Sequence, residues 1–211
     1  MATRLIIIRH GETEWNRRKK MQGHSDSSLS DLGKKQAEAV ADVISSHGPF
    51  DVLYTSDMGR ALETAGLINR DRQLEVIQET GLRERNLGVF QGLTWAECKE
   101  KYPDEYQRMQ TRDPDYVIPE GESSRQRMER NVNCLNSIAA QQEGKTVLVV
   151  AHGGVLDSIF RHTLQIPLDR ERAFSLFNAG INIFSVIDGK WVLEVWGDIA
   201  HLAGMGVMDD Y

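Results

Sequence analysis

Short runs of apolar and β-branched residues alternate along the chain with longer segments of helical periodicity. A short apolar run bounded by turn residues is typical of a strand that is buried on both faces. The predicted strands are Leu5–Ile8, Val52–Thr55, a weaker Leu74–Ile77, and Thr146–Val150. The last of these is the clearest, because β-branched residues fill an uninterrupted apolar run.

Helical patterns occupy the intervals between these strands. Ser30 and Ser56 are residue types that cap helices, and Thr94 has capping-box spacing to an acidic residue three positions later. Two predicted helices begin after these serines: one runs from Ser30 to near Gly48-Pro49, and the other from Ser56 to near Ile68. Three more are predicted over Trp95–Tyr102, from about Ser123 to Gln142, and over Val155–Leu164.

Strands that alternate with helices imply crossover connections, which produce a mainly parallel sheet with helices on both faces. Near the end of the chain, Ile181–Ile187 and Trp191–Val195 flank Asp188-Gly189, a strong hairpin signal. Such a hairpin adds antiparallel pairing to the sheet. We therefore predict an α/β fold with three layers, doubly wound, in which a mainly parallel sheet has an antiparallel edge strand.

The 211 residues contain no repeat, low-complexity segment or linker, so residues 1–211 are predicted to form a single domain. The segment Thr111–Gly121 contains two prolines and has no clear period, which predicts a loop or a lid. Residues 197–211 contain several glycines and end in acidic residues, which predicts a loose C-terminal tail.

Composition narrows the class of protein further. A net charge of −6 argues against nucleic acid as a partner. No apolar run approaches the roughly 18 residues of a membrane helix, and Leu5–Ile8 is too short for the core of a signal peptide. Cys98 and Cys134 form no CxxC pair, so we expect reduced thiols in a cytoplasmic protein.

Histidines and arginines follow three of the predicted strands. Arg9-His10 follows the first strand, Arg60 lies one turn into the helix after the second, and His152-Gly153-Gly154 follows the strongest strand. Ligands of open α/β sheets bind beyond the carboxyl ends of the strands. We therefore expect two histidines and two arginines to meet at one edge of the sheet.

These residue types suit a phosphoryl group. The planar fork of arginine matches phosphate oxygens, and glycines at a helix start let backbone N–H groups approach an anion. No metal-ligand spacing such as HExxH is present, so we expect neither a metal nor a cofactor. The basic run Arg17–Lys20 is equally consistent with a solvated loop and with steering of anions toward the pocket.

The same residues carry a family resemblance. Four segments resemble, in the family's order, the signature motifs of the histidine phosphatase (phosphoglycerate mutase-like) superfamily. They are Arg9–Thr13 with Asn16 and Gln22-Gly23 downstream, Ser56–Ala65, Leu82–Gly88, and Val150–Gly153. A weaker match lies at Gly121–Ser123.

The resemblance implies a role for each candidate. His10 would be the nucleophile that forms a phosphohistidine, and Glu84 would protonate the leaving oxygen and then take a proton from water. The residues implied to hold the phosphoryl group or the substrate are Arg9, Arg60, His152, Asn16, Gln22, Gly23, Arg85 and Gly153. Neutral imidazole is a competent nucleophile near pH 7, and cations stabilise a phosphoryl-transfer transition state.

The implied function is a metal-independent phosphomonoester phosphatase acting on a small phosphorylated metabolite. The motif pattern is closest to the broad-specificity phosphatase branch, and a cofactor-dependent phosphoglycerate mutase is the alternative. A non-catalytic binding protein is disfavoured, because every implied catalytic residue is present. We expect no nucleic-acid or membrane partner, and a homodimer is the candidate assembly.

Two departures argue against the mutase. After Glu84-Arg85 the chain has Asn86-Leu87-Gly88, whereas the motif typical of the mutases at this position is His-Tyr-Gly. The 67 residues between Glu84 and His152 contain nine basic and ten acidic residues, without the longer cationic insertion of the mutases.

Overall fold

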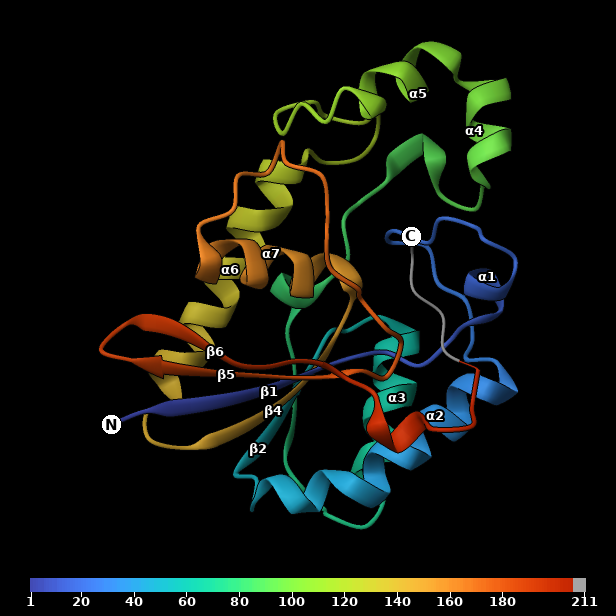
Figure 1. Cartoon of the computed structure of the whole chain (residues 1–211). Helices are drawn as coiled ribbons and strands as arrows, with labels where there is room; N and C mark the ends of the chain where they lie inside the picture. The colour runs from blue at the N-terminus through green and yellow to red at the C-terminus, as the bar shows by residue number, and fades with distance from the viewer. Residues whose placement is uncertain (207–211) are drawn as a thin grey trace.

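The computed structural model describes residues 1–206. Its centre is a six-stranded sheet in the order β3-β2-β4-β1-β5-β6 (Figure 1). The strands are β1 Thr3–Arg9, β2 Val52–Thr55, β3 Val76–Gln78, β4 Thr146–Ala151, β5 Ile181–Ile187 and β6 Lys190–Asp198. Parallel pairing joins β3, β2, β4 and β1, whereas β5 is antiparallel to both β1 and β6. The predicted mainly parallel sheet with an antiparallel edge is confirmed.

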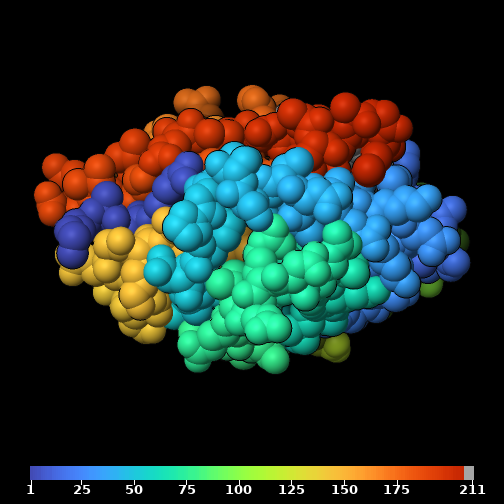
Figure 2. All heavy atoms as spheres, turned by 90° about the horizontal axis from the view of Figure 1, so that it is seen from below, coloured from blue at the N-terminus to red at the C-terminus, as the bar shows by residue number. Residues whose placement is uncertain are grey.

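Helices cover both faces of this sheet, which accounts for the three layers. The helices are α1 Glu14–Arg17, α2 Asp31–Val43, α3 Gly59–Asn69, α4 Trp95–Lys101, α5 Pro103–Gln110, α6 Ser124–Gln141 and α7 Gly153–Leu164. Figure 1 shows α6 and α7 on one face of the sheet and α2 and α3 on the other. Figure 2 views the molecule from the α2 and α3 side, where these blue-to-green segments cover the face and the C-terminal residues (red) border them.

The central strands are apolar throughout because both of their faces are buried. In β1, Leu5 and Ile7 pack into the cluster beneath α6 and α7, whereas Ile6 and Ile8 pack into the cluster beneath α2 and α3. Strand β4 alternates in the same way, with Val149 on the first face and Val150 on the second. All of these side chains are fully buried.

A smaller apolar cluster lies away from the sheet, where α4 and α5 pack on the loop that follows them. Phe90 and Cys98 form its centre, and Tyr116 and Ile118 of the predicted loop Thr111–Gly121 complete it. The segment has no helix or strand, as predicted. Its buried side chains anchor it to α4 and α5.

Several details differ from the sequence predictions. Helix α3 has Met58 as its N-cap, not Ser56, because the Ser56 N–H still donates to the Val150 carbonyl and continues the sheet pairing. The third strand is Val76–Gln78 and not Leu74–Ile77. Helices α1 and α5 were not predicted, since α1 has only four residues and α5 begins at Pro103 directly after α4.

The first part of the predicted loose tail, residues 197–206, packs against the rest of the fold. Strand β6 continues to Asp198, Leu202 is buried in the core, and the Gln36 amide donates to the Gly206 carbonyl. The rest of the predicted tail, 207–211, lies outside the described residues. Among residues 1–206, no helix is both long and apolar enough to cross a membrane.

The backbone that follows β1 lies unusually close to the first turn of α2. The Ser30 N–H donates to the Glu12 carbonyl at 2.9 Å, and the Ser30 hydroxyl caps α2 by accepting from the Gly33 N–H. A Cβ on Gly33 would overlap the Glu12 carbonyl oxygen, and a Cβ on Gly11 would overlap the Gly33 carbonyl oxygen. Two glycines therefore allow α2 to brace the segment directly after His10.

We expect Gly33→Ala to lower the free energy of unfolding by about 1–3 kcal/mol, because the added methyl group must displace rigid backbone. The matched control is Gly66→Ala in α3, where a Cβ meets no atom within 4 Å. That change should stabilise the protein by about 0.5–1 kcal/mol through helix propensity. Urea unfolding of both variants tests this, and equal stabilities for the two would contradict the close approach.

Candidate active site

His10 lies at the carboxyl end of β1, where its ring is almost completely buried. Its Nδ1 atom is 2.8 Å from the Gly11 carbonyl oxygen. A carbonyl only accepts hydrogen bonds, so Nδ1 carries the proton and donates it to this oxygen. The lone pair of the neutral ring is therefore on Nε2, which is the atom available for nucleophilic attack.

The surroundings of His10 keep the ring uncharged. Burial lowers the pKa of His10 well below its ordinary value, and the positive charges of Arg60 and Arg9 lower this pKa further. Neutral imidazole is the nucleophilic form, whereas imidazolium has no free lone pair. The arginines thus favour the reactive state of His10 and attract an anion at the same time.

His152 lies beside His10 because β1 and β4 are adjacent and parallel. The register pairs Arg9 with Ala151, so the two histidines follow paired positions and their ring centroids are 5.2 Å apart. His152 is fully buried, and neither ring nitrogen has a hydrogen-bond partner within residues 1–206. Burial and then Arg60 lower the pKa of His152 well below its ordinary value. Such unpartnered buried polar atoms are rare, and they fit a ring that is satisfied by a bound ligand.

Two buried arginines lie at the same edge of the sheet as the histidines. Arg9 ends β1 and donates to the Leu176 carbonyl. Arg60, in the first turn of α3, donates to the carbonyls of Gly23 and Ser25 and pairs with Asp26 at 3.0 Å. In the described part of the chain, the buried Arg60 Nε has no partner. Burial lowers the pKa of Arg60 below its ordinary value, and the charge of Asp26 opposes this.

The start of α7 supplies backbone donors next to these side chains. His152 is the N-cap of α7, and Gly153-Gly154 forms its first turn. The unpaired N–H groups of a helix start and the helix dipole both favour an anion there. A Cβ on Gly154 would overlap a carboxylate oxygen of Glu84, so glycine at this position leaves room for that side chain against the helix start.

Glu84 comes from the loop after β3 and meets the start of α7. One carboxylate oxygen accepts from the Gly154 N–H at 2.9 Å and the other from the Arg85 N–H at 2.7 Å. The backbone of Glu84 is fixed as well, because Arg130 of α6 and the His24 ring each hydrogen-bond to its carbonyl. These contacts hold the carboxyl group against the first turn of α7.

The remaining residues predicted for the site differ in their burial and in the contacts they make. Asn16 is buried in a capping box, where its side-chain oxygen Oδ1 accepts hydrogen bonds from the Thr13 N–H and from the Thr13 hydroxyl. Gln22 is buried, and its Oε1 has no partner among the described residues. Gly23 has a φ of +55°, and its carbonyl oxygen accepts a hydrogen bond from the Arg60 guanidinium. Arg85 lies farther out, where it donates to the carbonyls of Glu122 and Tyr116.

A cavity of about 360 Å³ opens next to Glu84 and the start of α7. Its apolar lining consists of Met21, Leu87, Trp95, Met109 and Leu176. Its polar lining includes Glu84, Arg85, Arg127, Asp157 and Arg172. Glu84 and the first turn of α7 line this space, which we call the leaving-group cavity after the role proposed for it below.

Some residues of this region were missed from the sequence. Asn178 donates to the His10 carbonyl at 2.9 Å, and Arg127 of α6 pairs with Asp157 of α7. The position of Asn178 follows from the antiparallel register that pairs Ile8 with Ile181. No comparable signal predicts the Arg127–Asp157 pair, which depends on how α6 packs against α7.

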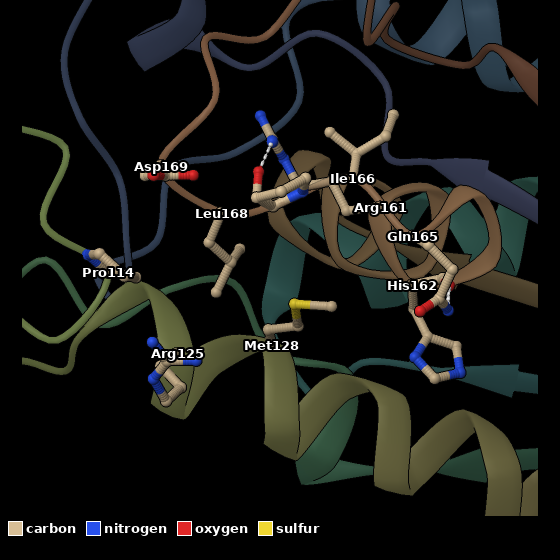
Figure 3. A pocket seen from close by; sticks show the side chains of 10 residues that line it. Pro114, Arg125, Met128, Arg161, His162, Gln165, Ile166, Leu168 and Asp169 are labelled. Carbon is tan, nitrogen blue, oxygen red and sulfur yellow. Dashed lines mark hydrogen bonds between the residues drawn. The ribbon is translucent and has the colours of Figure 1, made fainter.

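A second cavity, of about 460 Å³, lies between α6, α7 and the loop after α7 (Figure 3). Its lining includes Met128, His162 and Leu168, but none of the residues predicted from the sequence. Across the described chain, no three His, Cys, Asp or Glu side chains are grouped so as to hold a metal ion.

Comparison with known proteins assigns the family. The model of the histidine phosphatase superfamily (branch 1) matches residues 5–199. The chain belongs to this superfamily. The match includes all four motif segments and thus confirms the resemblance seen in the sequence.

Three similar proteins represent the family. The chain is 37% identical over 209 residues to the metal-independent phosphoserine phosphatase of Arabidopsis thaliana, covering 98% of this chain and 86% of that protein. It is 36% identical to phosphoglycerate mutase-like protein 4 of the same plant, covering 97% and 89%. The solved structure of Bacillus stearothermophilus YhfR superposes with a TM-score of 0.88 at 32% identity, covering 95% and 99%.

The two buried neutral histidines predict how the stability of the protein depends on pH. Both rings have a lowered pKa in the fold, whereas an unfolded histidine titrates near 6.5. The stability that comes from burying these neutral rings is fully present above pH 6.5, and it is lost as the pH falls toward their pKa values in the folded protein. His152→Asn should therefore reduce the slope of unfolding free energy against pH by up to about 1.4 kcal/mol per pH unit below pH 6.5.

Chemical denaturation at several pH values in phosphate-free buffer measures this slope. His162→Asn, which changes a histidine of the second cavity, is the matched control. An unchanged slope in His152→Asn would contradict the burial of a neutral ring at this position.

Proposed function

We propose that the protein is a metal-independent phosphomonoester phosphatase that acts through a phosphohistidine on Nε2 of His10. The observation that carries the proposal is the pair of buried histidines 5.2 Å apart, with one ring oriented for attack and the other left without partners. The superfamily assignment agrees with this chemistry.

In the first step, the Nε2 lone pair of His10 attacks phosphorus and the bond to the leaving oxygen breaks. Glu84, in its protonated form, donates its proton to that oxygen, so the product leaves as a neutral alcohol. The leaving-group cavity lies on this side of the site and accommodates the departing group. The phosphoryl group is then bound covalently to His10.

In the second step, water attacks phosphorus and the N–P bond breaks. The carboxylate of Glu84 takes the proton from the water, which restores the starting protonation state and releases inorganic phosphate. The same carboxyl group thus acts as acid and then as base.

Charge stabilisation comes from groups that are already in place. Arg9, Arg60, the His152 ring and the start of α7 surround the position expected for the phosphoryl oxygens. Because these donors are buried and fixed, they require little reorganisation in the transition state. Asn16, Gln22 and the Gly153 amide are proposed as further donors.

The proposed partner is a small phosphorylated metabolite, and phosphoserine is one candidate because a relative 37% identical bears that activity in its name. A cytoplasmic location remains a proposal, supported by two cysteines that are free thiols. Homodimer formation stays a prediction, as does the lack of nucleic-acid and membrane partners.

We expect His10→Ala to lower turnover by about a thousandfold or more, because the nucleophile is lost. Rapid quenching of the native enzyme with labelled substrate should trap an acid-labile, base-stable phosphoenzyme, and the variant should trap none. Native activity should also survive EDTA. His162→Ala, outside the site, is the control and should retain native turnover.

An acid-stable phosphoenzyme, or full activity of His10→Ala, would contradict the proposal. The same labelling experiment separates the phosphatase from a mutase. With 3-phosphoglycerate and a trace of 2,3-bisphosphoglycerate, label should appear as inorganic phosphate faster than as 2-phosphoglycerate. Faster formation of the isomer would favour the mutase.

Glu84→Gln should slow hydrolysis of an alkyl phosphate by about a hundredfold or more, because an alkoxide leaves poorly without a proton. An aryl phosphate should lose much less, since its leaving group needs little protonation. Glu75 is exposed and lies outside the site, so Glu75→Gln is the control for both substrates. Equal losses on both substrates would mean that Glu84 does not protonate the leaving group.

A further inference from the structure

One short segment, residues 21–26, holds the guanidinium group of Arg60 in place. The carbonyls of Gly23 and Ser25 accept hydrogen bonds from this guanidinium at 2.9 Å and 3.0 Å. The Asp26 carboxylate accepts from the guanidinium at 3.0 Å and from the backbone N–H of Arg60 at 3.3 Å. We call residues 21–26 the connecting segment, and the position of the buried Arg60 side chain depends on it.

The connecting segment also pairs with the loop that precedes α4. The Met21 N–H donates to the Leu93 carbonyl at 2.9 Å, and the Gly92 N–H donates to the Met21 carbonyl at 2.8 Å. The backbone N–H of His24 donates to the side-chain oxygen of Gln91. The segment therefore links the start of α3 to this loop.

The ring of His24 contacts the backbone of Glu84 in the same loop. Its Nε2 atom is 2.9 Å from the Glu84 carbonyl oxygen, which only accepts, so Nε2 carries the proton and donates it. Arg130 of α6 donates to the same oxygen at 3.1 Å. A carbonyl oxygen has two lone pairs and can accept both bonds. The Glu84 backbone is thus held from α6 by Arg130 and from the connecting segment by His24.

The place of the Glu84 carboxyl group follows from the place of this backbone. The carboxylate accepts from the Arg85 N–H at 2.7 Å and from the Gly154 N–H at 2.9 Å. Arg85 is the next residue of the chain, so a shift of the Glu84 backbone moves the carboxylate and this donor together, away from the helix start at Gly154. Because hydrogen bonds weaken steeply with distance and angle, such a shift disturbs the contact with α7.

The charges in this region agree with a neutral His24 that lies close to the site. Burial lowers the pKa of His24 below its ordinary value, and the hydrogen bond to the Glu84 carbonyl opposes this. At neutral pH the ring therefore carries a single proton, and the contact places that proton on Nε2. Burial also lowers the pKa of Arg60, whereas the charges of Asp26 and Glu84 raise it. Arg60 and Glu84 are thus close enough to interact.

We propose that His24 is a positioning residue, whose ring holds the Glu84 carboxyl group at a fixed place relative to the guanidinium of Arg60. The inference rests on the proposed phosphatase function and deepens it. Arg60 holds the phosphoryl group in that proposal, and Glu84 must reach the leaving oxygen of the same group. Proton transfer needs heavy atoms about 3 Å apart, and a displacement of about 1 Å slows a reaction by up to about a hundredfold.

The test changes the ring and keeps the backbone contacts of the connecting segment. His24→Ala removes the donor, whereas His24→Gln keeps an N–H donor on a side chain of similar reach. His162→Ala is the matched control, because His162 is also a half-buried histidine but lines the second cavity.

We expect His24→Ala to lower kcat/KM on phosphoserine, an alkyl phosphate, by about tenfold. The loss on p-nitrophenyl phosphate should stay within about twofold, because its leaving group needs little protonation. Competitive inhibition by inorganic phosphate, which reports on the phosphoryl end of the site, should be unchanged. His24→Gln and His162→Ala should remain near native in all three measurements.

A double variant shows whether the ring of His24 acts through Glu84. Since Glu84→Gln removes the proton donor, adding His24→Ala to it should cause no further loss on phosphoserine. Losses that multiply would overturn the proposal. Equal losses of His24→Ala on both substrates, or weaker inhibition by phosphate, would also overturn it, because they indicate a general structural role.

Amide hydrogen exchange tests the positioning without catalysis. The N–H groups of Arg85 and Gly154 donate to the Glu84 carboxylate, so both should exchange about tenfold faster in His24→Ala by NMR, and at the native rate in His162→Ala. Unchanged exchange in His24→Ala would overturn the role of His24.

The same measurement keeps this proposal separate from the phosphatase function. If the native protein hydrolyses neither substrate, the phosphatase proposal fails, and the exchange rates still decide whether His24 positions Glu84. If His24→Ala does not fold, His24→Leu takes its place in every measurement, because leucine fills more of the space and has no donor.

Discussion

The parallel pairing of β1 with β4 is the constraint on which the site depends. This register places Arg9 opposite Ala151, and the next residue of each strand is a histidine. A shift by one residue would move every side chain of a strand to the opposite layer, so the close packing of both buried layers holds the register. The core therefore fixes the distance between His10 and His152, two residues that are far apart in the sequence.

That same burial determines the chemistry of the pair. Removing the rings from water lowers the pKa of each histidine, and the nearby arginines lower it further. A ring that is neutral and fixed by the Gly11 carbonyl is a prepared nucleophile, whereas the unpartnered His152 ring is a prepared donor or acceptor. The unfavourable burial of Arg60 is offset by Asp26 and two carbonyls. An anionic substrate adds to that compensation.

The sequence by itself determined the layered sheet and which residues meet at the proposed phosphoryl end of the site. Apolar runs of four or five residues bounded by turn residues are typical of central strands, and the residues that follow parallel strands meet at one edge of the sheet. His10, Arg60 and His152 were predictable for this reason. Turn chemistry likewise predicted the hairpin at Asp188-Gly189, because few residues other than glycine adopt its backbone conformation.

The motif resemblance pointed to Glu84, but only the tertiary structure decided how the leaving-group side is arranged. Glu84 follows no strong pattern of its own, and its orientation comes from the Gly154 N–H and from Arg130 on another helix. The Arg127–Asp157 pair joins two helices whose polar positions face each other only after α6 and α7 pack. Local periodicity reports which face of a helix is buried, but it does not report which residue of another helix lies opposite. That choice is made by long-range packing.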